Sequence, residues 1–365
     1  MTDPIVAKIE ANPKYHALRR KRNTFGWLLT AIMMVVYYGS RNFMAEWEQL
    51  AGEVQTLLEQ RFPRTVIGYA YAGFAVDFSP YTEKLLGCAG ELAQYGLNEI
   101  ALLYVLESKK HADYGDHKNP AFEAEKKEAE EHLDNLAKEL EQGGIKVRKL
   151  LRWGNPAEEI IEAAREEDAD LIFLGARGKG FISRAFLGSV SERVVKLADR
   201  SVMIQHCRET RDDGGYSCEN ACSSIFGNIL VACDFSKYAD SVQPILVDLA
   251  RTLCTPITLL HVVEGKSDMG YEPLDKFKKE QVKEEMHRLE ELSYELSGFC
   301  KSVKLDIVNG SPPSAILSYA EAMDASLVLL GAFGSRGITP DLLGSVTERV
   351  MRKSDRPVMI LKSRR

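Results

Sequence analysis

One sequence pattern occurs twice in this chain: Gly-x-x-Gly, nine residues, and then Gly-Ser. Each copy follows an apolar run and precedes a segment with helical spacing. The glycines and serines of the pattern are Gly175, Gly178, Gly188 and Ser189 in the first copy, and Gly331, Gly334, Gly344 and Ser345 in the second. A single glycine-rich loop is weak evidence, because glycine and serine are ordinary turn residues. Two copies in matching surroundings predict two related domains, each with a backbone site for an anion.

The length and composition suit two globular domains in a reducing compartment. The chain has 365 residues, of which 45% are hydrophobic and 27% are charged, so it is long enough for two separate cores. Its formal net charge of −6 gives no general attraction to polyanions, so nucleic acid is not expected as a partner. The seven cysteines show no paired disulfide framework, and Cys88, Cys233 and Cys254 lie in apolar runs, where we expect them to be buried. These features predict a cytoplasmic protein.

Both halves of the chain show the same succession of apolar strands and amphipathic helices. We expect domains at residues 62–207 and 225–363, joined by a linker at 208–224. Strands are expected at 73–78, 99–106, 147–151, 170–175 and 201–205 in the first repeat, and at 228–235, 256–263, 303–308, 326–331 and 357–361 in the second. Helices separate these strands, including charged ones at 123–141 and 274–296, so a parallel sheet covered on both faces is predicted. The fold class is α/β, with two doubly wound, Rossmann-like domains in tandem.

Two aspartates and the two glycine-rich loops stand at the carboxyl ends of predicted strands. Asp77 and Asp234 end the first strand of each repeat, and Gly175 and Gly331 end the fourth. In open α/β sheets, ligands bind beyond these strand ends, at the point where the strand order reverses. If the first and fourth strands are neighbours, each carboxylate faces its loop across a crevice.

Each loop ends where a helix is predicted to begin. Glycine lets backbone N–H groups approach a ligand closely, and the helix dipole favours an anion at this end. Ser189 with Glu192, and Ser345 with Glu348, have the spacing of capping boxes, so we also expect both serines to cap their helices. Capping and phosphate binding are compatible.

On these motifs, residues 62–363 resemble two universal stress protein domains of the type with the nucleotide-binding loop. The resemblance implies the strand order 3-2-1-4-5 and an adenine nucleotide as ligand: ATP, ADP or AMP, with or without Mg²⁺. In that family the acid after the first strand contacts adenosine, the backbone near the end of the second strand holds the base, and the loop holds ribose and phosphates. The implied binding residues are Asp77, Val105, Gly175, Arg177, Gly178, Lys179, Gly188, Ser189, Val190 and Ser191 in the first repeat, and Asp234, Val262, Gly331, Gly334, Gly344, Ser345, Val346 and Thr347 in the second.

The two loops differ in charge. Arg177, Lys179 and Arg184 make the first loop basic, whereas the second contains Phe333 and Asp341. We expect phosphate attraction to favour the first repeat, although each basic residue is equally compatible with a solvated surface.

The resemblance also implies association through the last strand, which commonly pairs across a dimer in that family. Residues 201–205 and 357–361 are therefore expected to pair within this chain, as an intramolecular pseudo-dimer. Further association into a homo-oligomer is also expected.

The remaining metal and catalytic candidates are weaker. Tyr104 and His261 hold matching strand positions and are expected to be packed rather than catalytic. The soft ligands near the linker match no standard zinc spacing, so no metal site is predicted. They are His206, Cys207, Cys218 and Cys222.

The first fifty residues differ from the rest of the chain. Residues 23–40 are uncharged, largely apolar and flanked by basic residues, and their number is near the lower limit of about 17 for a membrane span. A hydrophobic helix is therefore expected within residues 1–50, as a membrane span, an interfacial or re-entrant anchor, or a buried or oligomerising helix. The first two interpretations imply contact with a membrane or a membrane protein through residues 19–41.

From residues 12–15 to 37–39 this segment resembles the start of a family of small bacterial inner-membrane proteins of unknown function. Only the first of that family's two spans is recognisable. The preceding basic residues predict a cytoplasmic amino terminus, so a single crossing would place both repeats outside, where ATP is absent. The membrane interpretation thus conflicts with the nucleotide interpretation.

Three functions are compatible with these features. The first is a cytoplasmic nucleotide-binding regulator of the stress response, in which the nucleotide alters association or a partner contact and is hydrolysed slowly at most. The second is an enzyme of the wider adenine-nucleotide α/β group, although the sequence shows no nucleophilic cysteine motif, no paired acid and base, and no Walker lysine pattern. The third is a membrane-tethered adaptor that couples nucleotide state to a transporter.

Overall fold

The computed structural model describes residues 71–77, 99–107, 120–176, 187–206, 208–212, 215–219, 225–265, 271–273, 282–334 and 343–363. Within these ranges, no helix combines the length and apolar character that a bilayer crossing requires. The expected hydrophobic helix in residues 1–50 lies outside the described residues.

From β2 onward, the first repeat alternates strands and helices as the sequence predicts. Its elements are β1 (Tyr71–Ala75), β2 (Glu99–Glu107), α5 (Pro120–Gln142), β3 (Lys146–Gly154), α6 (Pro156–Glu166), β4 (Leu171–Gly175), α7 (Ser189–Leu197) and β5 (Ser201–Gln205). The Asn155 side chain caps α6 by accepting a hydrogen bond from the Ala157 N–H group, and Pro156 occupies the first turn, where a missing N–H group is tolerated.

The second repeat has the same order of elements, together with helix α8 between its first two strands and one short strand, neither of which has a counterpart among the described residues of the first repeat. Its elements are β8 (Ile229–Cys233), α8 (Lys237–Leu253), β9 (Pro256–Glu264), β10 (Tyr271–Pro273), α10 (Lys283–Ser297), β11 (Ser302–Gly310), α11 (Pro312–Ala322), β12 (Leu327–Gly331), α12 (Ser345–Lys353) and β13 (Val358–Leu361). Strand β10 pairs antiparallel with the end of β11.

The segment expected to be a plain linker contains a β-hairpin. Strands β6 (Arg208–Asp212) and β7 (Gly215–Glu219) pair with one another antiparallel, as a separate two-stranded sheet. The two residues between these strands in the sequence are Asp213 and Gly214, an Asp-Gly pair of the kind typical of tight hairpins. This hairpin was not predicted from the sequence, because residues 208–219 lack an alternating apolar pattern.

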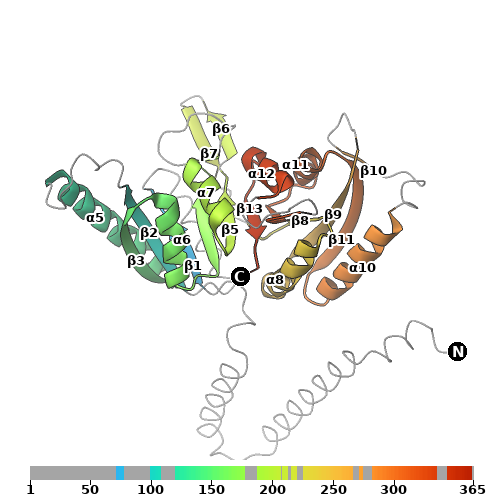
Figure 1. Cartoon of the computed structure of the whole chain (residues 1–365), viewed down its shortest axis with the longest axis horizontal. Coiled ribbons are helices and arrows are strands. Elements are labelled where there is room, and N and C mark those ends of the chain that lie inside the picture. The colour runs from blue at the N-terminus through green and yellow to red at the C-terminus, as the bar shows by residue number, and fades with distance from the viewer. Residues whose placement is uncertain are drawn as a thin grey trace, which may run out of the picture. The chain divides into compact units, whose positions relative to one another are not determined.

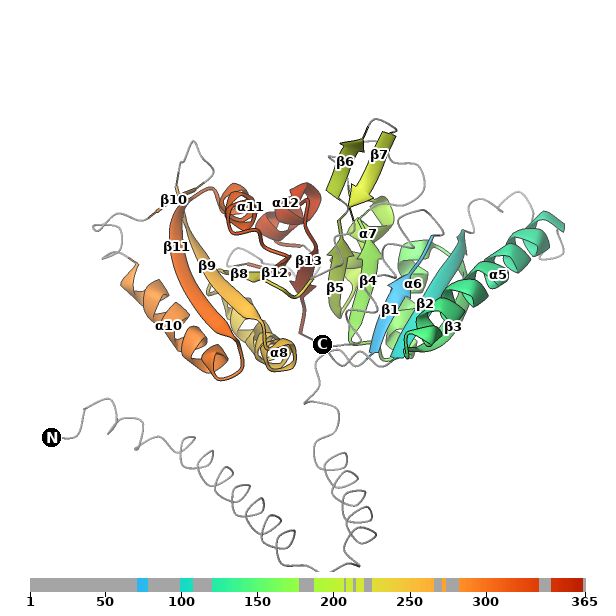
Figure 2. The ribbon, with the colours of Figure 1, turned by 180° about the vertical axis from the view of Figure 1, so that it is seen from behind.

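The strands of both repeats form one sheet of eleven strands, in the order β10-β11-β9-β8-β12-β13-β5-β4-β1-β2-β3 (Figures 1 and 2). Read from the outside inwards, each repeat has the order 3-2-1-4-5, and its five strands are parallel. The predicted doubly wound fold is therefore confirmed in both repeats. The predicted pairing of the last strands is also confirmed, because β5 and β13 pair antiparallel with Met203 opposite Met359.

Two apolar layers hold helices on the two faces of this sheet. Helices α5, α8 and α10 pack on one face, with Leu133, Leu246 and Leu289 buried against the strands. Helices α6, α7, α11 and α12 pack on the other face, where Val194 and Val350 are fully buried. Burial on both faces explains why the strands read as continuous apolar runs rather than as alternating ones.

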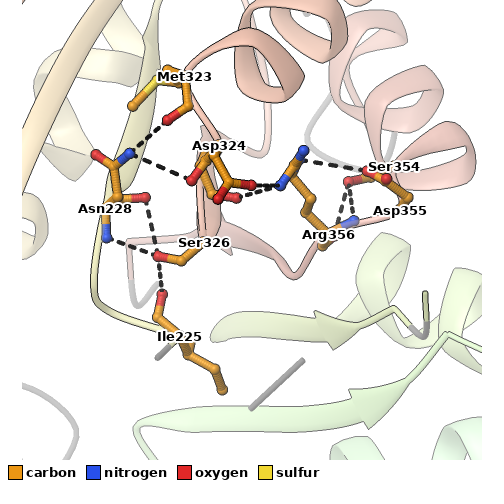
Figure 3. Close-up of polar contacts among 9 residues, drawn as sticks. Ile225, Asn228, Met323, Asp324, Ser326, Ser354, Asp355 and Arg356 are labelled. Carbon is orange, nitrogen blue, oxygen red and sulfur yellow. Dashed lines mark hydrogen bonds and ion pairs between the residues drawn. The ribbon is translucent and has the colours of Figure 1, made fainter. Parts of the chain in front are cut away.

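An arginine clamp fixes the amino end of the fourth strand in each repeat. In the second repeat, Arg356 Nη1 donates to Asp324 Oδ1 at 3.1 Å and to the Ala325 carbonyl oxygen at 2.9 Å (Figure 3). In the first, Arg200 Nη1 makes the matching bond to Asp168 Oδ1 at 3.2 Å. Both aspartates adopt left-handed backbone conformations with φ of 49°, which short polar side chains tolerate best among non-glycine residues. The duplicated clamp lies at the end of the sheet opposite the glycine-rich loops and is structural.

Four charged side chains connect helix α7 of the first repeat to helix α12 of the second. Glu192 Oε1 lies 2.6 Å from Arg352 Nη2 across the boundary and 2.6 Å from Lys196 Nζ within α7. Glu348 Oε1 completes the cluster, at 3.1 Å from Arg352 Nη2 and 3.9 Å from Lys196 Nζ. The cluster therefore follows the pseudo-twofold relation of the repeats.

Glu192 is expected to make the stability of the protein depend on pH in the acidic range. The hydrogen bond from Lys196 and the charge of Arg352 outweigh burial and hold the pKa of this carboxyl below its ordinary value of 4.5. A lowered folded-state pKa means that the stabilisation is present at neutral pH and is lost as pH falls through the folded-state value. We expect Glu192→Gln to lower the free energy of unfolding by about 1 kcal/mol at pH 7 and by little at pH 3, as measured by urea denaturation. Glu290→Gln, an exposed position on α10, is the matched control, and an equal loss at both pH values for Glu192→Gln would contradict the assignment.

Candidate functional site

The second repeat contains a crevice beyond the carboxyl ends of β8 and β12. These strands are parallel neighbours, with Val231 opposite Leu329, and the helices that follow them lie on opposite faces of the sheet. This is the point where the strand order reverses, which is the usual place for a ligand in an open α/β sheet. The cavity here has a volume of about 950 Å³. All eight residues predicted for this repeat line it: Asp234, Val262, Gly331, Gly334, Gly344, Ser345, Val346 and Thr347.

Asp234 follows β8 directly and is held by the start of α8. Its Oδ1 atom accepts hydrogen bonds from the Ser236 backbone N–H at 3.1 Å and from Ser236 Oγ at 2.9 Å. Ser236 is the N-cap of α8, since its Oγ accepts from the Ala239 N–H group at 3.1 Å. The bonds at Oδ1 therefore fix the direction of the carboxylate relative to the sheet.

The carboxylate of Asp234 faces the glycine-rich loop, as the sequence analysis expects. A Cβ atom on Gly334 would lie 2.9 Å from Asp234 Oδ2, closer than side-chain atoms ordinarily approach. Only glycine at position 334 therefore leaves this carboxylate where it is. The two groups that the sequence placed at the ends of separate strands are brought together by the pairing of β8 with β12.

The expectation that Ser189 and Ser345 cap their helices is wrong. The N-caps are the preceding glycines, Gly188 and Gly344, and neither helix has a side-chain capping bond at this position. Each serine is instead the first residue inside its helix. The sequence spacing suggested a capping box because a helix that begins one residue later gives nearly the same apolar pattern.

Ser191 and Thr347 have a structural role that the sequence did not reveal. Each is buried, and its hydroxyl group donates to the carbonyl oxygen of the glycine that ends the fourth strand. The distances are 2.8 Å from Ser191 Oγ to Gly175 O and 2.8 Å from Thr347 Oγ1 to Gly331 O. These bonds fix the first turn of α7 and α12 against the strand end, so the loop between them is held at both ends.

The first turn of α12 presents backbone donors to the crevice. The Gly344 N–H group is bonded to the Ala332 carbonyl oxygen at 2.9 Å, and the first helical bond runs from Glu348 N to Gly344 O. Helical geometry leaves the N–H groups of Ser345, Val346 and Thr347 without a carbonyl one turn earlier. Together with the helix dipole, these groups favour a bound anion.

An aromatic and cationic stack lines another part of the crevice and was not predicted. Arg288 of α10 lies 4.8 Å from the Phe235 ring centre, and that ring is 4.9 Å from the ring of His261. His261 Nδ1 is 2.8 Å from the Cys233 carbonyl oxygen, which only accepts, so Nδ1 carries a proton. Phe235 adopts a left-handed conformation with φ of 55°, an uncommon state for a bulky residue. Arg288 could not be predicted as a crevice residue, because the charged residues of such a helix are normally solvated.

Cys233 lies in the crevice but is not a nucleophile at neutral pH. Burial and the neighbouring Asp234 carboxylate raise the pKa of its thiol to about 12. The reactive form of cysteine is the thiolate, so this residue stays in its inert form.

The first repeat repeats the main elements of this arrangement. Strands β1 and β4 are parallel neighbours, and the Gly188 N–H group donates to the Ala176 carbonyl oxygen at 2.8 Å, as Gly344 does to Ala332. Burial and the charges of Glu125 and Asp77 raise the pKa of Tyr104 to about 12, so its hydroxyl is neutral. The structure describes seven of the predicted residues: Asp77, Val105, Gly175, Gly188, Ser189, Val190 and Ser191. Three others lie outside the described residues: Arg177, Gly178 and Lys179.

Metal binding finds no support in the part of the chain that the structure describes. There, no group of three or more histidine, cysteine, aspartate or glutamate side chains is arranged to hold a metal ion. Cys207 and Cys222 of the cysteine cluster lie outside the described ranges.

The fold and the crevice define a class of protein: tandem, doubly wound α/β domains with a glycine-rich loop at the strand-order reversal. The model of the universal stress protein family matches residues 72–206 and 226–362. The chain therefore belongs to the universal stress protein family and to the stress-response class. The inner-membrane resemblance of residues 12–39 lies outside both matched ranges.

Individual relatives agree with this assignment. A universal stress protein of Methanocaldococcus jannaschii is 32% identical over 147 residues, which are 36% of this chain and 91% of that protein. A universal stress protein of Mycolicibacterium smegmatis is 28% identical over 229 residues, covering 61% of this chain and 71% of the relative. The crystal structure of a universal stress protein from Archaeoglobus fulgidus aligns with a TM-score of 0.58 at 27% identity, over 80% of this chain and 98% of that one.

Proposed function

We propose that the chain is a regulatory protein of the stress response that binds ATP, or another adenine nucleotide, in its repeats. The nucleotide state changes self-association or contact with a partner rather than driving rapid turnover, and the protein acts in the cytoplasm. One observation carries the proposal: a single crevice in the second repeat brings together the Asp234 carboxylate, the Gly331–Gly334 loop and the first turn of α12.

The size and chemistry of this crevice fit a nucleotide. Its volume of about 950 Å³ lies at the upper end of the usual range of about 300–1,000 Å³ for small-molecule sites. We assign the adenosine to Asp234 and to the backbone at Val262, and the phosphates to the loop and the N–H groups of Ser345 and Val346. By position, Asp77, Val105 and the loop from Gly175 to Ser189 have the same roles in the first repeat.

The proposed phosphate sites stand next to the boundary between the repeats. Helices α7 and α12 begin at the two sites. Their first turns carry Glu192 and Glu348, and their last turns carry Lys196 and Arg352, the other members of the charged cluster. A phosphate bound at the first turn of either helix would shift that helix and therefore the charged side chains that it carries. Nucleotide binding can in this way alter the contact between α7 and α12.

The proposal is tested by identifying the small molecules that the full chain retains. We expect mass spectrometry of gently purified, then denatured, protein to detect AMP, ADP or ATP. Calorimetry of emptied protein is expected to show ATP binding, with GTP as the control for the base. Absence of retained adenylate together with no calorimetric binding would overturn the proposal, and ATP turnover well above a slow background would favour an enzyme instead.

A further inference from the structure

Two cysteines of the second repeat precede adjacent strands, at the end of the sheet opposite the crevice. Cys254 ends α8 two residues before β9, and Cys300 follows α10 two residues before β11. Strands β9 and β11 are parallel neighbours, and their first residues, Pro256 and Ser302, are register partners. The cysteines therefore hold matching positions ahead of two adjacent strands.

The surrounding contacts draw the two cysteine-bearing turns together. The guanidinium of Arg251, three residues before Cys254, lies 4.6 Å from the ring centre of Phe299, which precedes Cys300. The same two helices are also joined by Gln243 in the first half of α8, whose Nε2 atom donates to Oε2 of Glu295, near the end of α10, at 2.8 Å. The carboxyl-terminal ends of α8 and α10 are thus in direct contact.

Both thiols are free, and they differ in accessibility. Cys254 is exposed, contrary to the expectation from its apolar surroundings, because the left-handed end of α8 turns it out of the core. Cys300 is half-buried, and burial together with the charge of Cys254 raises the pKa of its thiol. Adjacent strands are about 4.8 Å apart, within the Cα separation that a disulfide needs, and the two cysteines precede register partners of such a pair.

We propose that Cys254 and Cys300 are an oxidisable thiol pair that closes into an intrachain disulfide when the protein meets a hydroperoxide. The exposed Cys254 thiolate attacks the peroxide oxygen, which gives a sulfenic acid and releases hydroxide. The Cys300 thiolate then displaces the sulfenic oxygen as water and forms the sulfur–sulfur bond. In total, two thiols and one hydrogen peroxide give one disulfide and two water molecules, and a dithiol reductant reverses the change.

Peptide mapping of the oxidised full chain tests the proposal without relying on any variant. The folded protein is treated with hydrogen peroxide, its remaining thiols are alkylated, and the digest is analysed by mass spectrometry without and with reduction. We expect one peptide pair that joins Cys254 to Cys300 and is lost on reduction. Cys254→Ser and Cys300→Ser are each expected to abolish that pair, whereas Cys233→Ser is expected to retain it.

Every other outcome contradicts the proposal. Alkylation of both thiols after peroxide treatment would show that they do not react. A link from Cys254 to any other cysteine, or to a second chain, would show that Cys300 is not its partner. Conversion of Cys254 to sulfinic acid with Cys300 still alkylated would show that the two sulfur atoms do not meet.

Discussion

Gly334→Ala is expected to weaken ATP binding to the second repeat by about tenfold to a hundredfold. The new Cβ atom would lie 2.9 Å from Asp234 Oδ2, while Oδ1 of the same carboxylate is held by Ser236. The carboxylate must move away from the position assigned to adenosine. The loss of one hydrogen bond to a charged group costs about 1.5–3 kcal/mol, which corresponds to that range of affinity. Titration calorimetry of the full chain measures it directly.

Controls separate this effect from a general loss of structure. Gly298→Ala is the matched control, because a Cβ atom there meets nothing within 4 Å, and we expect unchanged affinity. Gly188→Val is expected to remove binding in the first repeat only, by obstructing its anion site. We therefore expect Gly334→Ala to weaken binding in the second repeat alone, and Gly188→Val to remove binding in the first repeat alone. An unchanged second site in a folded Gly334→Ala protein would refute the placement of adenosine beside Asp234.

Lys362→Ala is expected to lower the free energy of unfolding by about 2–4 kcal/mol. Lys362 is only 5% exposed, and its Nζ atom crosses from the second repeat to the end of α7 in the first. There it donates to the Val195 and Ala198 carbonyl oxygens at 2.5 Å and 2.6 Å. Alanine would leave both carbonyl groups without this donor and would leave a cavity in place of the side chain. Urea unfolding at neutral pH measures the change.

Two further variants divide this effect into its parts. Lys362→Met keeps the apolar stem, so we expect only the share that comes from the two lost hydrogen bonds. Lys353→Ala, an exposed position on α12, is expected to stay within about 0.5 kcal/mol of the unaltered chain. A loss below about 1 kcal/mol in Lys362→Ala would show that this lysine does not hold the repeats together.

The sequence predicted the fold closely, for a physical reason. Strands buried on both faces are apolar along their whole length, and their alternation with helices permits few parallel topologies. The duplicated loop and the two aspartates marked the ends of the fourth and first strands, and the pairing of β8 with β12 then brings Asp234 to Gly334. The resemblance to a known family supplied the strand order and the assignment of roles.

Errors arose where the outcome depended on a shift of one residue or on a distant contact. The helices begin at Ser189 and Ser345 rather than after them, because Ser191 and Thr347 are anchored to the strand ends. Cys254 was expected in the core, but the left-handed turn at the end of α8 exposes it.

The sequence by itself determined the two α/β repeats and the glycine and aspartate positions of the crevice. Hydrophobic periodicity and the order of elements along the chain can both be read directly from the residues. Only the tertiary structure decided which side chains from distant segments meet. The stack of Arg288 on Phe235 and the reach of Lys362 into the other repeat each join residues from different elements. Such contacts depend on how helices pack on a twisted sheet, which no local pattern encodes.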